Sequence, residues 1–93
     1  MIERRIRDLH ARLLHVRNEL SLLDEQISVV SEGAEEARVR ALVSETPLAT
    51  HDYEGARRHG EAMLRARAML SATQEDLERR RDELLYKVSR RSQ

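Results

Sequence analysis

The residues best suited to metal or acid–base chemistry are four histidines, and their spacing does not favour a shared site. Ligands on one helix must lie three or four residues apart, because only that spacing puts them on the same face. His10 and His15 are five residues apart, and His51 and His59 are eight apart. We therefore predict no metal ligand set within either pair, and no bound cofactor.

A metal-binding helical bundle stays open as a second alternative because of one group of residues. In a chain folded back near its middle, four glutamates and one histidine would reach a similar level: Glu32, Glu35, Glu36, His59 and Glu61. No histidine follows a glutamate at a spacing of three, so the Glu-x-x-His pair of di-iron bundles is missing. We interpret these side chains as a solvated charged face.

Covalent catalysis has no support in the sequence. There is no cysteine, no Gly-x-Ser-x-Gly motif and no glycine-rich phosphate loop. We therefore expect a protein that is not an enzyme.

Arginine clusters near the two ends of the chain form a candidate surface for acidic partners. Residues 1–17 and 79–93 contain eleven basic and four acidic side chains, whereas the whole chain has no net charge. We name the following set the basic end: Arg4, Arg5, Arg79, Arg80, Arg81, Arg90 and Arg91. Nucleic-acid binding is an alternative function here, although interleaved acids and the lack of an aromatic platform favour ordinary exposed helix charges.

The segment around the only proline contains a second candidate surface, the tip. Leu48 and Tyr53 are apolar or amphipathic and lie beside Glu45 and Asp52. If the chain turns here, these four residues are presented together and bind another protein. The acidic tip is similar to those of coiled-coil factors that enter the secondary channel of RNA polymerase, which implies the transcription machinery as an alternative partner. The zinc-binding cysteines typical of such factors are missing.

The element that must position these residues is a long helix marked by an apolar stripe. Twelve residues recur at alternating steps of four and three: Ile2, Ile6, Leu9, Leu13, Val16, Leu20, Leu23, Ile27, Val30, Ala34, Ala37 and Ala41. This is the a/d pattern of a coiled coil. It predicts one helix from residue 2 to about 44, continuous through Gly33, although a mid-helix glycine costs about 1 kcal/mol relative to alanine.

Residues 45–51 are predicted to form the turn, and a second helix is predicted from about 52 to 90. Thr46 as N-cap with Pro47 at the first helical position is one possible start, and Thr50 is a second possible N-cap. The second helix has one apolar row, spaced by seven: Ala56, Met63, Leu70, Leu77 and Leu84. We assign its half-heptad row to residues of mixed type: His59 or Gly60, Ala66, Thr73, Arg80 and Lys87.

A turn centred near residue 48 predicts an antiparallel coiled-coil hairpin with a specific register. Every expected pair is apolar: Ala41 with Ala56, Ala34 with Met63, Ile27 with Leu70, Leu20 with Leu77, and Leu13 with Leu84. The predicted fold class is therefore all-α, with one helical hairpin as a single domain over residues 1–93.

Several apolar residues lie outside these rows, and a lone hairpin cannot cover them. The main ones are Leu14, Leu22, Val29, Val39, Leu64, Met69 and Leu85. Exposed apolar surface of this kind usually marks an interface. We expect it to bind a second copy, which gives a homodimeric four-helix bundle, or a helix of a different protein.

The composition fits a helical interaction module. Charged residues make up 37% of the chain and only two residues are aromatic, which is typical of coiled coils rather than of deep globular cores. The charged N-terminus does not fit a signal peptide and no run reaches membrane-spanning length, so we expect a cytoplasmic protein without membrane contact. Arginine dominates over lysine, which indicates a GC-rich bacterial source. We predict a small bacterial regulatory or adaptor protein that acts through protein–protein contacts.

Overall fold

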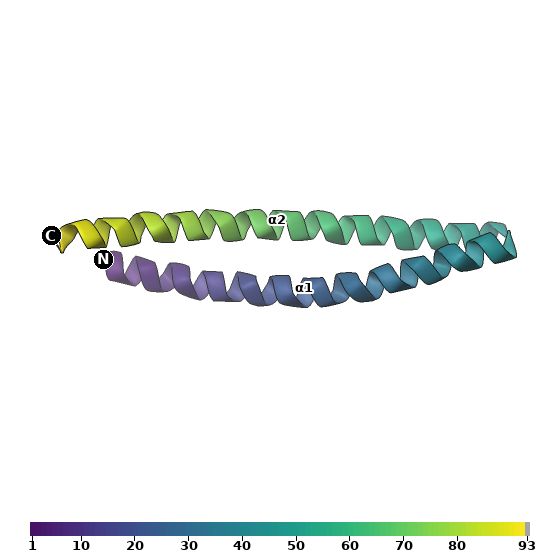
Figure 1. Ribbon diagram of the computed structural model, residues 1–93, viewed down its shortest axis with the longest axis horizontal. Coiled ribbons are helices and arrows are strands. Elements are labelled where there is room, and N and C mark those ends of the chain that lie inside the picture. The colour runs from purple at the N-terminus through teal and green to yellow at the C-terminus, as the bar shows by residue number, and fades with distance from the viewer. Residues whose placement is uncertain (93) are drawn as a thin grey trace. The chain divides into compact units, whose positions relative to one another are not determined.

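The chain folds into two long helices. The computed structural model describes residues 1–92. Among them, α1 spans Ile2–Ser44 and α2 spans Pro47–Arg91, with no strand (Figure 1). The predicted all-α class is confirmed, and α1 continues through Gly33 as expected. Within this part of the chain, neither helix has an apolar stretch long enough to cross a lipid bilayer.

The turn is shorter than the expected 45–51, because only Glu45 and Thr46 separate the helices. Helix α2 therefore begins at Pro47 and not near residue 52. The Thr46 hydroxyl oxygen accepts a hydrogen bond from the backbone N–H of Ala49 at 3.2 Å, which is N-cap geometry. Pro47 suits the first helical position, since its fixed φ fits a helix and its missing N–H would have no helical partner there. The earlier of the two possible caps starts the helix.

Glu45 ends α1 in the left-handed backbone region, with a φ of 53°. Its N–H donates to the carbonyl oxygen of Ala41 at 3.1 Å, which satisfies one of the last carbonyls of the helix. Glycine is the usual residue at such a position, because a Cβ is crowded there. This one residue lets the chain reverse direction within two residues.

The apolar stripe of α1 is confirmed residue by residue. All twelve members are buried or half-buried, and every other residue of α1 is exposed. The most enclosed members are Leu9, Leu13, Val16, Leu20 and Ala37. The heptad pattern therefore defines which face of α1 contacts α2.

The companion row of α2 differs from the expected one. The apolar row from Ala56 to Leu84 is buried or half-buried as predicted. Its true partners begin three residues earlier and are all half-buried: Tyr53, Gly60, Arg67, Gln74, Arg81 and Val88. The residues expected instead, apart from Gly60, are exposed: His59, Ala66, Thr73, Arg80 and Lys87. A single apolar row does not reveal whether it occupies heptad position a or d, and both choices bring polar residues into the seam.

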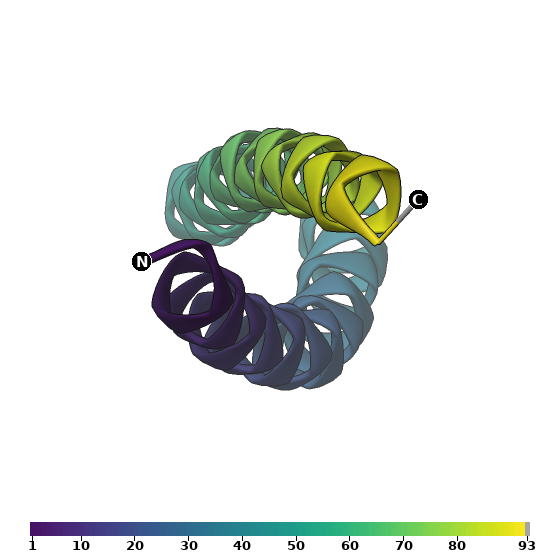
Figure 2. The same cartoon turned by 90° about the vertical axis from the view of Figure 1, so that its left-hand side faces the viewer.

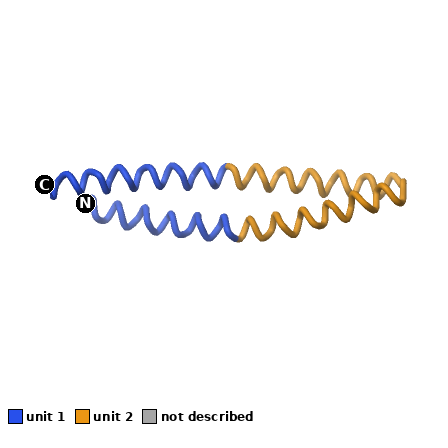
Figure 3. The backbone as a smooth tube through the Cα atoms, in the orientation of Figure 1, with its two compact units in different colours: residues 1–21, 69–93 blue, residues 22–68 orange. Residues whose placement is uncertain are grey.

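The chain divides into two compact units, each containing a segment of both helices (Figure 3). Unit 1 is Met1–Ser21 with Met69–Gln93, and unit 2 is Leu22–Ala68. In unit 1, the start of α1 lies beside the end of α2, as the end-on view also shows (Figure 2). Unit 2 contains the turn and forms a helical hairpin (Figure 1).

Unit 1 holds the leucine-rich core. Leu9, Leu13, Val16, Leu20 and Leu77 form one buried cluster, against which Leu70 and Leu84 pack. Leu13 and Leu77 are fully enclosed. Burying a leucine side chain contributes about 1.5–3 kcal/mol, so this cluster is the main stabilising feature of unit 1.

In unit 2 the register of the two helices is shifted by one heptad from the expected one. A Cβ on Gly60 would lie 3.8 Å from Val30, so these residues face each other. The expected register would place Gly60 opposite Ala37 instead. The Arg67–Asp24 pair agrees with the observed register. The shift arises because the turn is centred between residues 45 and 46, and a slip of one heptad keeps apolar residues opposite each other.

Candidate interaction surfaces

The tip is built by the end of α1, the two-residue turn and the first turn of α2. Leu48 is 70% exposed, and Glu45 and Asp52 are also exposed, so these three residues are presented as expected. Tyr53 is different: it is half-buried and belongs to the seam. Three of the four predicted tip residues are therefore available for contact, while Tyr53 packs within unit 2.

Tyr53 lines an open groove along one flank of unit 2. The groove is lined by residues of both helices: Ser31, Ala34, Glu35, Arg38, Tyr53, Ala56, Arg57, Gly60, Glu61 and Leu64. Its charged residues are joined by Glu35–Arg38 and Arg57–Glu61 ion pairs, at 2.6 and 2.7 Å. The hydrogen bond from Arg38 lowers the pKa of Glu35, and the pKa of Arg38 is raised chiefly by Glu35. The four charged residues that line the groove therefore neutralise one another in pairs.

A third ion pair of unit 2 lies on the same flank and joins the two helices. Arg67 donates through Nε to Asp24 Oδ1 at 2.5 Å and through Nη2 to Oδ2 at 3.3 Å. This hydrogen bonding lowers the pKa of Asp24 and raises the pKa of Arg67. Arg67 occupies a seam position, so the pair explains how a charged residue is accommodated there. We name this side of unit 2 the charged flank; it comprises Asp24, Ser31, Glu35 and Arg38 with Arg57, Glu61, Leu64 and Arg67.

The opposite flank of unit 2 has a different character. Helical geometry places on it the residues at heptad positions c and g: Leu22, Gln26, Val29, Gly33, Glu36, Arg40 and Val43 from α1, and Leu48, Asp52, Gly55, His59, Ala62 and Ala66 from α2. We name this set the glycine flank. All of its members are exposed, and no ion pair of the described residues lies within it. The exposed fractions of its large apolar members run from 59% at Leu22 to 79% at Val43.

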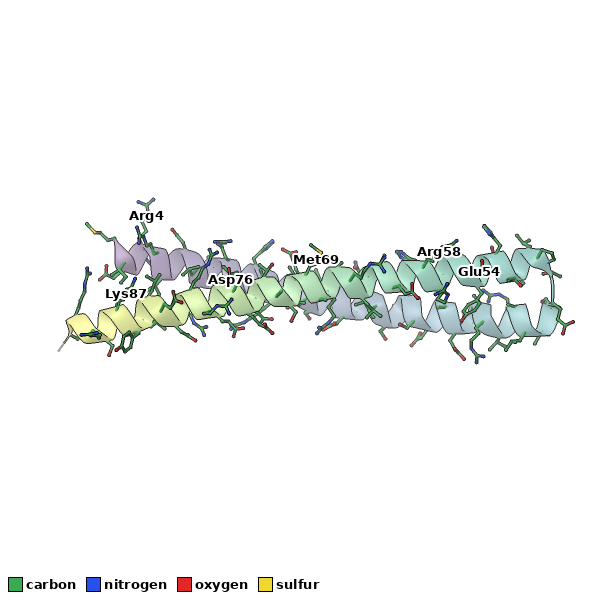
Figure 4. The ribbon with its side chains drawn as sticks, turned by 90° about the horizontal axis from the view of Figure 1, so that it is seen from above. Arg4, Glu54, Arg58, Met69, Asp76 and Lys87 are labelled. Carbon is green, nitrogen blue, oxygen red and sulfur yellow. The ribbon has the colours of Figure 1, made fainter. Side chains whose placement is uncertain are left out.

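The seven apolar residues predicted as a dimer or partner stripe are all exposed, by 46–73% of their surface. They do not share one face. Leu22 and Val29 lie on the glycine flank, Leu64 lines the groove of the charged flank, and Val39 lies opposite the seam. Leu14, Met69 and Leu85 belong to unit 1, and Met69 extends from the surface of its helix (Figure 4). The structure therefore separates the predicted stripe into several small patches.

The basic end is partly neutralised by acidic neighbours. Arg79 and Arg80 both contact Asp76, at 3.3 and 3.0 Å, and Arg81 contacts Asp82 at 3.1 Å. Arg81 is also half-buried in the seam. The remaining members of the set are exposed: Arg4, Arg5, Arg90 and Arg91. Figure 4 shows Arg4, Asp76 and Lys87 on the surface of unit 1.

A groove at the basic end brings three arginines together over an apolar floor. It is lined by Arg5, Arg12 and Arg80, with Asp8, Glu83, Leu9 and Leu84. Arg80 is already held by Asp76, and two carboxylates share the groove. The Arg90 guanidinium lies 6.0 Å from the centre of the Tyr86 ring, within reach of a cation–π contact. Three of the seven arginines of the basic end therefore contact a neighbouring carboxylate: Arg79, Arg80 and Arg81.

The expected gathering of Glu32, Glu35, Glu36, His59 and Glu61 does not form a ligand set. Residues 1–92 contain no group of three or more histidine, aspartate or glutamate side chains placed to hold a metal ion. Glu35 and Glu61 face the charged flank and pair with arginines, whereas His59 lies on the glycine flank. Glu36 shares the glycine flank with His59, and the two flanks separate this pair from Glu35 and Glu61.

Comparisons with protein-family models, with curated proteins and with solved structures found no significant match to this chain. We therefore infer the function of this chain from the surfaces described above.

Proposed function

We propose that this chain is a non-enzymatic helical module that self-associates and binds another protein through its tip. The observation that carries the proposal is the position of the large apolar side chains that the seam leaves outside. On the glycine flank these are Leu22, Val29, Val43 and Leu48, exposed by 59–79%. An apolar surface outside a completed seam is typical of an interface.

Self-association is supported by the size of the internal core. Among residues 1–92 only six apolar residues are buried, five of them in the unit 1 cluster and one, Ala37, in unit 2. Small helical domains with so little enclosed surface are commonly stabilised by forming oligomers. A two-fold dimer adds two more helices and is the simplest way to cover the exposed face.

The tip supports the second part of the proposal. Leu48 is an exposed apolar side chain between two exposed acidic residues, Glu45 and Asp52. The positive φ of Glu45 holds the turn in a conformation that glutamate rarely adopts. Backbone of this kind is often retained where a loop contacts a partner.

The primary test is the molar mass in solution, measured by light scattering over a concentration series. The single chain has a mass of 10.8 kDa. We expect a concentration-dependent approach to twice that mass, and a melting temperature that rises with protein concentration, because association stabilises the folded state. A mass that stays at one chain up to the highest accessible concentration would contradict self-association.

The tip is tested separately by site-specific photo-crosslinking from position 48 in cells, with position 42 as the matched control. Leu42 is also exposed but lies on α1 before the turn. We expect position 48 to give a discrete crosslink to a different protein, distinct from a crosslinked dimer of this chain, and we expect that product to be missing from position 42. Equal crosslinking from both positions would argue against a dedicated tip surface.

A further inference from the structure

We propose that the self-association surface is the glycine flank of unit 2, and that the two copies pack in parallel with α1 of each chain against α2 of the other. This inference rests on the proposed function and specifies which face forms the dimer. It depends on three observations: two glycines without an internal role, one large side chain level with a small one, and a match of charges.

Gly33 and Gly55 have no packing role within the chain. A Cβ at either position would meet nothing within 4 Å. By contrast, a Cβ at Gly60 would contact Val30 in the seam. A mid-helix glycine costs about 1 kcal/mol relative to alanine, so two such residues weaken the helices without an internal benefit. Both glycines lie on the same flank at nearly the same level, where they leave room for the backbone of a neighbouring helix.

The two helices contribute side chains of different size to this flank. From α1 comes Val29, and at a similar level on α2 lies Ala62. These levels follow from the Val30–Gly60 register. In a parallel two-fold dimer, Val29 of one copy lies over the partner's Ala62. An antiparallel dimer would instead oppose large residues on α1 and leave the alanines of α2 facing each other.

The charged residues of the glycine flank favour the same parallel arrangement of the two copies. Arg40 of α1 and Asp52 of α2 lie at about the same level on the glycine flank, and no ion pair joins them within the part of the chain described. The parallel two-fold axis places Arg40 of each copy over the partner's Asp52, so that the contact is made twice. The ion pairs of unit 2 are all on the charged flank, which leaves these two residues available for an intermolecular pair.

The geometry is tested by disulfide crosslinking, which is direct because the chain has no cysteine. Chains carrying Val29→Cys are mixed with chains carrying Ala62→Cys and oxidised. We expect a covalent dimer from the mixture and little from either chain alone. The matched control mixes Ser28→Cys with Glu61→Cys, which moves each thiol by one residue onto the other side of its helix, and should give no crosslink.

A charge-exchange cycle gives an independent readout. Arg40→Asp or Asp52→Arg alone should raise the dimer dissociation constant by about tenfold or more, and the double variant should recover affinity. Gly33→Leu should also weaken the dimer while leaving helicity intact, since the added side chain meets open space within the chain.

The outcomes separate the two proposals. A dimer by light scattering that fails to crosslink at positions 29 and 62 and is unaffected by Arg40→Asp would overturn the glycine flank but keep self-association. Crosslinking of Val29→Cys chains with themselves, faster than in the mixture, would overturn the parallel arrangement. A monomer at all concentrations would remove the proposed self-association itself.

Discussion

At the scale of single residues, Glu45 has an unfavourable backbone conformation. Its φ of 53° lies in the left-handed region, which a Cβ disfavours by roughly 1–2 kcal/mol. Sequence patterns did not indicate this, because a glutamate gives no signal for such a conformation. The two-residue turn requires it, since the chain must leave α1 and reach the Thr46 cap at once.

We expect Glu45→Gly to stabilise the folded chain by about 0.5–1 kcal/mol, because glycine adopts a positive φ without steric cost. Urea unfolding followed by circular dichroism measures the change. Glu45→Ala is the control, since it removes the charge but keeps the Cβ. An equal gain in the alanine variant would assign the effect to charge and not to backbone conformation.

A second residue-scale feature is the Asp24–Arg67 pair, which makes stability depend on pH. The pKa of Asp24 is lowered from its ordinary value of 3.8 by the Arg67 hydrogen bond. The folded state therefore holds this proton less tightly than the unfolded state. The stabilisation is fully present above the ordinary pKa and is lost as the pH falls through the lowered value.

Asp24→Asn should accordingly lower the urea midpoint at neutral pH, and the difference from the natural chain should shrink as the pH falls below the lowered pKa. Glu25→Gln is the control, because Glu25 is the adjacent exposed carboxylate at a position that faces away from α2. If Asp24→Asn and Glu25→Gln shift the midpoint equally at every pH, the pair has no specific role.

At the scale of the elements, the heptad pattern of α1 was sufficient to predict its contact face completely. A helix repeats nearly every 3.5 residues in a coiled coil, so alternating steps of three and four define one face without further information. The adjacent leucines show how sharp the boundary is, since Leu13 is 0% exposed and Leu14 is 47% exposed.

We expect Leu13→Ala to cost about 2–5 kcal/mol of unfolding free energy, and Leu14→Ala less than about 1 kcal/mol. The two changes remove the same atoms from neighbouring positions of one helix, so helix propensity and composition are matched. Chemical denaturation of both variants measures the difference. Similar losses would show that the seam does not run along the assigned face.

Helix α2 was harder to read from sequence, because only one of its two seam rows is apolar. Arg67, Gln74 and Arg81 occupy the other row. The signal that could have found this row is the seven-residue series that starts at Tyr53 and ends at Val88. The sequence did not reveal the register of the two helices either, because a slip of one heptad keeps apolar residues opposite each other. Only the length of the turn selects between the expected register and the shifted one.

At the scale of the whole molecule, the predicted surfaces were placed less well than the helices. Exposed residues follow no packing period. The sequence therefore did not indicate that the exposed apolar residues Leu14, Leu22, Val39 and Leu64 lie in separate patches. The seven-residue repeat of α2 also contains a row at heptad position c, which includes Leu48, Gly55 and Ala62. Two residues of that row, Gly55 and Ala62, belong to the proposed dimer face.

The uneven composition of the seam has a consequence for local unfolding. In unit 1 the seam encloses leucines, whereas in unit 2 it is formed largely by small residues: Ala34, Ala37, Ala41, Ala49, Ala56 and Gly60. Less apolar surface is lost when unit 2 opens, so its backbone amides should exchange with deuterium at a lower opening free energy than those of unit 1. Exchange measured at low and high protein concentration should show protection of unit 2 rising with concentration, while the leucine core changes little. The part of the chain that is weakest alone is then the part that a second copy strengthens.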